Sequence, residues 1–160
     1  MDAGCDGQLL RRLPRWTTND RKQLWLPDKL YIRDSGMLHA LLGVPDAGTL
    51  AQHGAAGNSW EGHAIVALIM ATDLDARHAY FRADDGAAEM DLVLARRGQI
   101  WGIEIKKSAN PALGKGFYAA REVLKCVRSI VVYRGADRFQ ADRTVEMMAL
   151  RDAAREVAAW

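Results

Sequence analysis

The sequence predicts an α/β protein in which a mixed β-sheet, built around a central antiparallel hairpin, is flanked by helices. Two apolar runs rich in Ile and Val, residues 92–95 and 100–105, are separated by Arg-Arg-Gly-Gln, the pattern of a β-hairpin. Runs with apolar residues at helical spacing stand before and after this hairpin. Residues 129–133 form a short, almost wholly apolar run, which is typical of a strand buried on both faces.

The composition indicates one ordinary globular unit. The chain has 160 residues, of which 49% are hydrophobic and 26% charged, so a packed core is favoured over disorder. The net charge of +2 is too small to indicate a polyanionic partner by itself. The two cysteines, Cys5 and Cys126, form no Cys-x-x-Cys pair, which argues against a zinc site or a disulfide framework. Without a membrane-length apolar stretch or a signal-peptide pattern, we expect a cytoplasmic protein that does not associate with membranes.

We expect two parts, an N-terminal segment over residues 1–57 and the α/β core over residues 58–160. The N-terminal segment is predicted to be partly irregular. Its expected elements are a helical fragment over 9–13, a strand over 24–33 that is strongest at 30–32, a helix from a cap at Asp34 or Ser35 to Leu42, and a loop over 45–57.

The core is predicted to begin with a helix over residues 60–71, capped by Asn58 or Ser59, with Glu61 in its first turn. The elements expected after it are a strand over 78–83, the hairpin, a helix over 117–127, a strand over 129–133, a loop over 134–143, an edge strand over 145–150 and a helix over 152–159.

Charged residues interrupt both strands of the hairpin. Glu89 and Asp91 share one face of the first strand, and Glu104 and Lys106 share one face of the second, because side chains alternate along a strand. If Arg97 and Gly98 form a two-residue turn, then Asp91 faces Glu104 and Glu89 faces Lys106. Like charges directly opposed in a sheet are destabilising, so two facing carboxylates need a reason. A hard divalent cation such as Mg²⁺, which takes carboxylate oxygens, supplies one.

The order Asp91, then Glu104-x-Lys106, after Glu61 on a helix, resembles the PD-(D/E)XK nucleases, which share a restriction-endonuclease-like core. The resemblance implies that Asp91 and Glu104 bind Mg²⁺ or Mn²⁺ and that Glu61 assists the metal. It also implies that Lys106 orients the attacking water or stabilises charge on the phosphate. Glu89 is a further candidate, because Gly-x-x-Glu-x-Asp-Leu-Val is similar to several branches of the superfamily.

A longer resemblance is to the domain-of-unknown-function family 4143, usually the C-terminal domain of prokaryotic AAA-type ATPases. It is carried by KLYIRDSGMLHALL at residues 29–42, SWEG at 59–62, the hairpin, and VVYRG at 131–135. No Gly-x-x-x-x-Gly-Lys-Ser/Thr motif occurs, so no nucleotide site is expected in this chain. The resemblance implies an ATPase domain or subunit as a partner.

Two functions follow as expectations. The first is a Mg²⁺-dependent nuclease-like domain that hydrolyses phosphodiester bonds of DNA through Asp91, Glu104, Lys106 and Glu61. The alternative is a non-catalytic accessory domain that binds nucleic acid or a protein beside an ATPase; a degenerate remnant with structure but no activity is a third reading.

The candidate residues have plainer readings as well. The acidic hairpin can be a solvated face with a Glu89–Lys106 pair, and Glu61 can be a helix-dipole contact. Other residues with two readings are Trp60 and Trp101, as core or base-stacking residues, and Lys107, Lys115, Arg121 and Lys125, as solvated or phosphate-binding residues. Ser59 has no histidine or acid assigned to it by the sequence.

Overall fold

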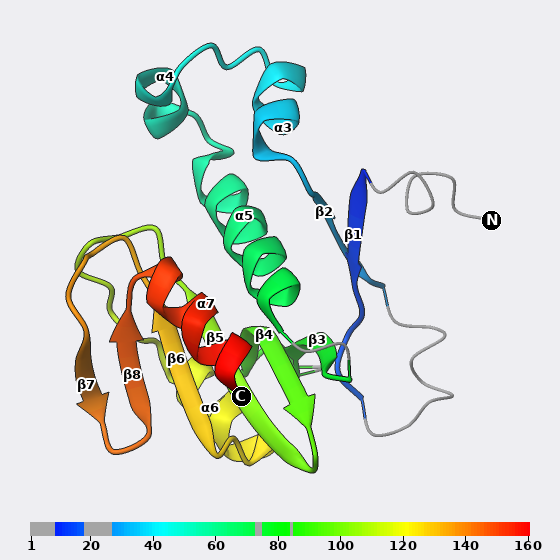
Figure 1. Ribbon diagram of the computed structural model, residues 1–160, viewed down its shortest axis with the longest axis vertical. Coiled ribbons are helices and arrows are strands. Elements are labelled where there is room, and N and C mark those ends of the chain that lie inside the picture. The colour runs from blue at the N-terminus through cyan, green and yellow to red at the C-terminus, as the bar shows by residue number, and fades with distance from the viewer. Residues whose placement is uncertain (1–8, 18–26, 73–74, 84) are drawn as a thin grey trace.

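The computed structural model describes residues 9–17, 27–72, 75–83 and 85–160 (Figure 1). Its β-strands are β1 (Leu10–Leu13), β2 (Lys29–Ile32), β3 (Arg77–Arg82), β4 (Glu89–Arg96), β5 (Gln99–Ile105), β6 (Arg128–Val132), β7 (Phe139–Asp142) and β8 (Val145–Met148). Its helices are α3 (Ser35–Leu41), α4 (Ala47–Gln52), α5 (Ala56–Ala71), α6 (Lys115–Leu124) and α7 (Leu150–Ala159).

Six strands form one mixed sheet in the order β3-β4-β5-β6-β8-β7. The β3–β4–β5 meander is antiparallel, β6 is parallel to β5 and to β8, and β7 is antiparallel to β8. The carboxyl ends of β5, β6 and β8 therefore meet at one edge of the sheet, the edge toward which the arrow of β8 points in Figure 1. The predicted α/β class, a mixed sheet around a hairpin with helices beside it, is confirmed.

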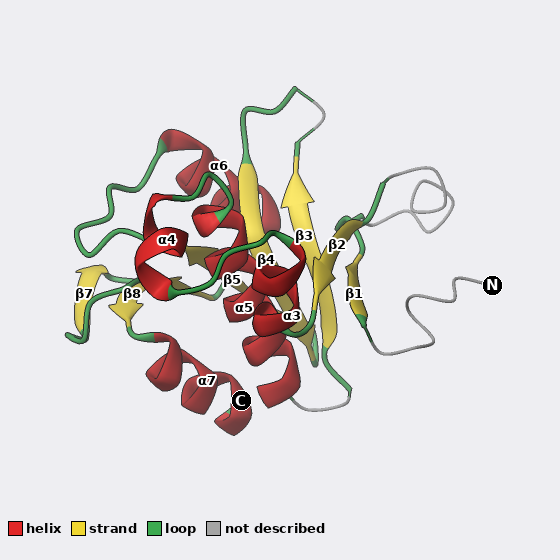
Figure 2. Cartoon of the chain, turned by 90° about the horizontal axis from the view of Figure 1, so that it is seen from above, coloured by secondary structure: helices red, strands yellow, loops and turns green. Residues whose placement is uncertain are grey.

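Helices cover both faces of the sheet, and each face has its own apolar core. The α5 and α7 side packs around fully buried residues such as Ile65, Leu92 and Ile130. The α6 side packs around Met90, Val93 and Phe117, and α6 and α7 lie on opposite sides of the sheet in Figure 2. The adjacent residues Leu92 and Val93 of β4 supply opposite cores, because successive side chains of a strand point to opposite faces. Met90 lies in the same core as Val93, because the pairing of β4 with β3 shifts register between these two residues.

Strands β1 and β2 form a separate antiparallel ribbon. Leu13, at the end of β1, is fully buried in the α5-side core. Just after it, an isolated parallel bridge joins Arg15 to Tyr80 of β3. These contacts hold β2 beside α5, so residues of β2 can reach the acidic end of the hairpin.

The hairpin has the register predicted from the turn. Leu92 pairs with Ile103, and the ladder runs to Arg96 opposite Gln99. Arg97 and Gly98 both have positive φ, at 50° and 76°, as the favoured two-residue hairpin turn requires. The paired residues start at Leu92 opposite Ile103, so Asp91 and Glu104 lie just beyond the ladder at its open end, and the predicted Asp91–Glu104 pairing is not among the described pairs.

Several predicted boundaries and elements are wrong. Residues 10–13 form β1, because pairing with β2 overrides a weak helical pattern. The predicted loop over 45–57 contains α4, whose N-cap is Asp46, and α5 starts at Ala56 without a side-chain cap. The predicted loop over 134–143 contains β7, which makes β8 an inner strand of the sheet. Residues 24–26 of the predicted second strand lie outside the described residues.

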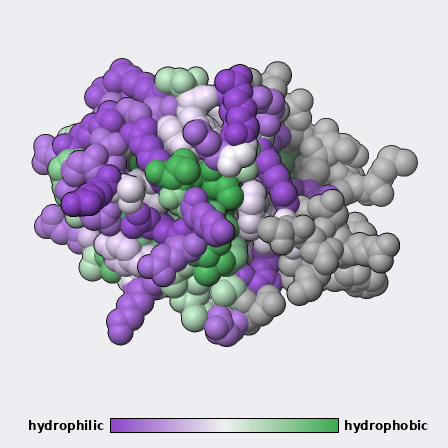
Figure 3. All heavy atoms as spheres, turned by 90° about the horizontal axis from the view of Figure 1, so that it is seen from below, coloured by the Kyte–Doolittle hydropathy of each residue, from purple (hydrophilic) through white to green (hydrophobic). Residues whose placement is uncertain are grey.

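The two ends of the molecule differ in their surfaces. Seen from below, the end at the hairpin turn shows mostly hydrophilic side chains around a smaller apolar area (Figure 3). At the opposite end, α3 contains no buried residue, and its Leu41 is 71% exposed. Within the described ranges, no helix has both the length and the apolarity needed to span a membrane.

Candidate active site

Four elements bring acidic and basic side chains together at the carboxyl edge of the parallel strands. Glu104 is the penultimate residue of β5, and Asp91 is the third residue of β4. Glu61 lies in the second turn of α5, and Lys29 and Tyr31 come from β2. The predicted residues Asp91, Glu104, Lys106 and Glu61 are therefore gathered in one place, with Glu89 at its border.

The buried Glu104 and the half-buried Asp91 form the centre of this group. The backbone N–H of Ile105 donates to Asp91 Oδ2 at 2.8 Å, which fixes the carboxylate against the end of β5. Burial, together with the charges of Glu104 and Glu61, raises the pKa of Asp91 to about 7. Burial also raises the pKa of Glu104, whose exposed fraction is only 9%. The Asp91 carboxyl therefore keeps its proton to a higher pH than an ordinary aspartate does.

Lys106 forms a salt bridge with Glu104, two residues before it in the chain. Its Nζ lies 2.5 Å from Glu104 Oε1, and its backbone N–H donates to the Val132 carbonyl at 2.8 Å. Burial opposes the charge of Lys106, but the hydrogen bond and the charge of Glu104 raise the pKa of Lys106 above its ordinary value. The alternative of a Glu89–Lys106 pair is wrong, because Glu89 lies 3.6 Å from Lys29 instead.

Strand β2 supplies two residues that the sequence analysis did not select. Tyr31 donates its hydroxyl to Glu61 Oε1 at 2.7 Å, and Lys29 Nζ lies 3.3 Å from the same oxygen. Burial and the hydrogen bond to Glu61 raise the pKa of Tyr31. Lys29 and Tyr31 are two residues apart and therefore share one face of β2. This spacing was the one sequence pattern that could have indicated that they act together.

A glycine allows this contact between β2 and α5. A Cβ atom on Gly62 would lie 3.0 Å from Tyr31 Cδ1, so the Tyr31 ring packs where a larger side chain would stand. The residue next to Glu61 therefore has to be small for Tyr31 to reach the carboxylate. A cavity of about 530 Å³ between β2, α3 and α5 has Lys29, Tyr31 and Glu61 in its wall.

The charges fit a divalent cation held by two protein carboxylates. The four carboxylates Glu61, Glu89, Asp91 and Glu104 face two ammonium groups, which leaves a formal charge of −2 when all are ionised. Within the described ranges, no three His, Cys, Asp or Glu side chains form a ready-made metal cage. Mg²⁺ commonly takes one or two carboxylates and completes its shell with water and substrate phosphate, so Asp91 and Glu104 suit it. Glu61 already accepts hydrogen bonds from Lys29 and Tyr31.

The other candidates have more ordinary surroundings. Asp34 caps α3 by accepting from the Met37 N–H at 2.9 Å, as predicted, and Trp101 is buried in the core. Arg121 is held by Asp142 at 3.2 Å. Partial burial raises the pKa of the Cys126 thiol to about 11, which disfavours the reactive thiolate at neutral pH.

One pair of residues was not foreseen. His39 Nε2 lies 2.7 Å from Ser59 Oγ and joins α3 to α5 across 20 residues of sequence. No short-range pattern could have indicated it. Among the described residues, no carboxylate hydrogen-bonds to His39, so the pair lacks the third member of a hydrolase triad.

Comparison with known proteins identifies relatives of this chain. The chain is 34% identical over 145 residues to "Uncharacterized protein Rv2008c" of Mycobacterium tuberculosis (strain ATCC 25618 / H37Rv). It matches "Uncharacterized protein Mb2031c" of Mycobacterium bovis (strain ATCC BAA-935 / AF2122/97) to the same extent. Each match covers 91% of this chain but only 32% of the relative, so the chain spans about a third of the length of these curated relatives.

No solved structure matches the chain significantly. The model of the domain of unknown function DUF4143 matches residues 56–152, from the start of α5 into α7. This match takes in the meander and the acidic group but leaves out β2. Because it covers more than half of the 160 residues, the chain belongs to the DUF4143 family.

Proposed function

We propose that this domain has a restriction-endonuclease-like core and hydrolyses phosphodiester bonds of DNA with Mg²⁺ or Mn²⁺. The observation that supports the proposal is the pair of half-buried Asp91 and buried Glu104, with Lys106 Nζ 2.5 Å from Glu104 Oε1. Two carboxylates brought together at the end of a hairpin, with an excess of negative charge, are costly unless a cation joins them.

The residues have distinct roles in this reaction. Asp91 and Glu104 hold the divalent ion, which when bound stabilises the negative charge that develops on the phosphoryl oxygens. Lys106 keeps its proton, because its pKa is raised, and donates hydrogen bonds to the scissile phosphate or to the attacking water. Glu61, fixed by Tyr31 and Lys29, orients water at the border of the site.

The experiment is a cleavage assay on single-stranded, duplex and branched DNA with Mg²⁺ or Mn²⁺. We expect Asp91→Asn, Glu104→Gln and Lys106→Met each to lower the cleavage rate by about 10²-fold or more. Asp85→Asn is the matched control, since exposed Asp85 also accepts one backbone N–H, from Ala87 at 2.9 Å. Cleavage that survives both carboxylate substitutions would come from elsewhere and would overturn the proposal.

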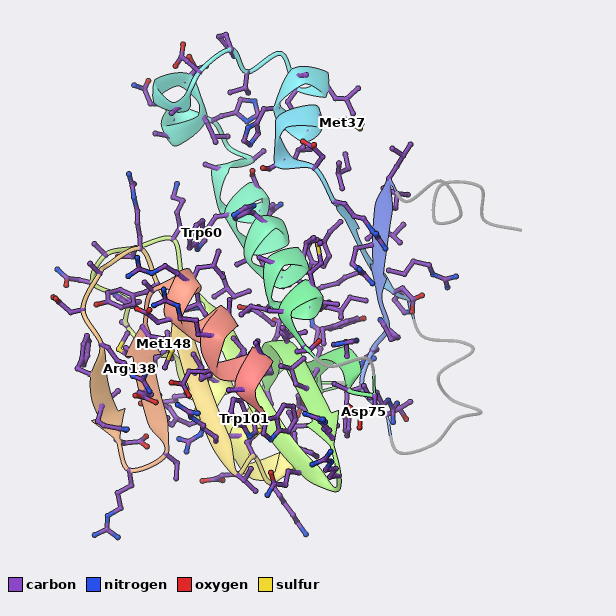
Figure 4. The ribbon with its side chains drawn as sticks, in the orientation of Figure 1. Met37, Trp60, Asp75, Trp101, Arg138 and Met148 are labelled. Atoms are coloured by element: carbon purple, nitrogen blue, oxygen red, sulfur yellow. The ribbon has the colours of Figure 1, made fainter. Side chains whose placement is uncertain are left out.

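A second candidate is an accessory domain that docks an ATPase domain, and the surface of α3 favours it. This helix buries none of its residues, and neighbouring apolar side chains are exposed on it and on β2: Leu30, Met37, Leu41 and Leu42. Figure 4 shows Met37 on the outer side of α3. Isolated exposed apolar side chains are ordinary, but four of them on neighbouring elements mark a surface suited to a protein partner.

This candidate is tested with the part of Rv2008c that the chain does not match, supplied as a separate polypeptide. We expect Leu41→Glu to abolish association measured by calorimetry. Met70→Glu is the matched control, because Met70 is 73% exposed, like Leu41 at 71%, but lies near the far end of α5. Equal effects of the two substitutions, or no association at all, would rule the docking out.

A further inference from the structure

We propose that a second cavity, on the other side of α5, binds one unpaired nucleotide of a single strand next to the acidic site. The cavity has a volume of about 330 Å³, at the small end of the range for ligand pockets. Its walls include Leu50, Trp60, His63, Lys107 and Arg134. The inference rests on the proposed nuclease function and specifies the form of its substrate.

The basic side of the cavity is suited to a phosphate. Lys107 and Arg134 are exposed, and neither forms an ion pair with any residue in the described part of the chain. The backbone N–H of Arg134 donates to the Ser108 carbonyl at 3.4 Å, which ties the loop after β6 to the loop after β5 and keeps the two cations together. Two adjacent, uncompensated cations at a pocket attract a phosphate group.

The opposite side is suited to a base. Trp60 presents its ring to the cavity, and Ala47, Leu50 and Ala51 of α4 close the apolar wall. Figure 4 shows Trp60 on the side of α5 that faces away from β2. Cations beside an aromatic ring and an apolar wall are the combination that binds single strands, since every base has a face for stacking.

The position of the cavity connects it to the acidic site. Lys107 directly follows Lys106, so their Cα atoms are about 3.8 Å apart. Ser35, Ser59 and His63 line both this cavity and the one that leads to Glu61. A strand with one phosphate at Lys106 therefore has its neighbouring nucleotide within reach of Lys107, and that nucleotide has to be unpaired for its base to enter.

The test is binding of a fluorescein-labelled strand of ten thymidines, measured by anisotropy in EDTA so that no cleavage occurs. We expect Arg134→Ala and Lys107→Ala each to weaken binding about 10-fold and to lower the slope of log K against log salt by about 0.7, one phosphate contact on a single strand. Arg143→Ala is the matched control, because Arg143 is an exposed arginine in the turn between β7 and β8. We expect it to change binding less than twofold.

A second readout locates the base. Titration of ¹⁵N-labelled protein with the same strand should shift the indole resonance of Trp60, assigned with Trp60→Phe, more than those of the other four tryptophans. Three results would contradict nucleotide binding in this cavity. They are an equal loss of affinity for Arg134→Ala and Arg143→Ala, an unshifted Trp60 indole resonance, and equal affinity for single-stranded and duplex DNA. If Arg134→Ala and Lys107→Ala weaken binding but the wild type cleaves no DNA in Mg²⁺, the nuclease function is wrong and the nucleotide pocket stands. If the wild type cleaves DNA but these substitutions leave binding unchanged, the nucleotide pocket is wrong and the nuclease function stands.

Discussion

At the scale of single residues, the main feature is a carboxylate that the fold holds partly protonated. Burial, Glu104 and Glu61 raise the pKa of Asp91 from 3.8 to about 7, while its one direct hydrogen bond in the described structure comes from the Ile105 N–H. A group of this kind lowers the stability of the metal-free fold. Such a cost is common where a protein keeps charges together for a function.

This cost predicts a pH dependence. Between pH 4 and pH 7 the unfolded chain releases the Asp91 proton more readily than the folded chain, so the free energy of unfolding should fall as the pH rises through this range. Asp91→Asn removes the titration and keeps an oxygen for the Ile105 N–H. We expect this variant to be more stable than the wild type at pH 8, by up to about 4 kcal/mol, and similar at pH 3.5, in urea unfolding with EDTA.

The control is Asp85→Asn, which replaces an exposed carboxylate. Its stability should follow the wild type at every pH. A destabilised Asp91→Asn variant at pH 8 would show that the ionised carboxylate supports the fold, contrary to the prediction.

The sequence predicted half of this site for a physical reason. The two-residue turn sets the hairpin register as far as Leu92 opposite Ile103, so one turn assignment was enough to place Asp91 and Glu104 at the same end of the hairpin. Lys29 and Tyr31 meet Glu61 across about thirty residues. Contacts of that range depend on how β2 packs on α5, which no local pattern specifies.

At the scale of elements, the site depends on the close approach of β2 and α5. Gly57 and Gly62 lie in the same helix, but a Cβ atom at Gly57 meets no other atom within 4 Å, whereas one at Gly62 meets the Tyr31 ring at 3.0 Å. Gly57 therefore only lowers the helix propensity of α5, whereas Gly62 is needed for the close packing of the Tyr31 ring.

We expect Gly57→Ala to stabilise the protein by about 0.5–1 kcal/mol through helix propensity. Gly62→Ala should be less stable than Gly57→Ala by about 1 kcal/mol or more, because the Tyr31 ring has to move from Glu61. In a Tyr31→Ala background this difference should disappear. Urea unfolding of the four variants measures it, and a difference that persists without the ring would refute the packing explanation.

The elements that the sequence missed share a cause. Helix α4 is six residues long and exposes most of its side chains, and β7 is a four-residue edge strand with a bulge in its pairing to β8. Neither has enough buried residues to produce a periodic pattern. The longer elements with buried faces, such as β4, β5 and α6, were recognised because their apolar residues recur in register with the core.

At the scale of the whole molecule, the folded unit extends past the family match, which ends at residue 152. Ala153 and Val157 of α7 are buried in the α5-side core. Trp160 stacks on Trp101 with ring centroids 4.6 Å apart, and Arg96 donates to the Trp160 carbonyl. The end of α7 therefore seals the face of the sheet that carries α5.

We expect a chain ended after Asp152 to lose at least about 3 kcal/mol of unfolding free energy, because it uncovers the apolar surface under Val157 and Trp160. Chemical unfolding monitored by circular dichroism measures the loss. Arg151→Ala, at a side chain that is 77% exposed, is the control and should change stability by less than about 0.5 kcal/mol. A truncated chain as stable as the full one would mean that α7 is dispensable.

The tight turn at Arg97 and Gly98 also determines when the site assembles. A hairpin closes in about 1–10 μs, whereas the hydrogen bonds between β2 and Glu61 of α5 join residues that are 30 and 32 positions apart in the sequence. During refolding, Asp91 and Glu104 therefore meet before Lys29 arrives to offset their charge. We expect Mg²⁺ to accelerate refolding of the wild type in stopped-flow experiments and to leave the rate of Asp91→Asn nearly unchanged, so that the ion acts as a folding aid before it acts on any substrate.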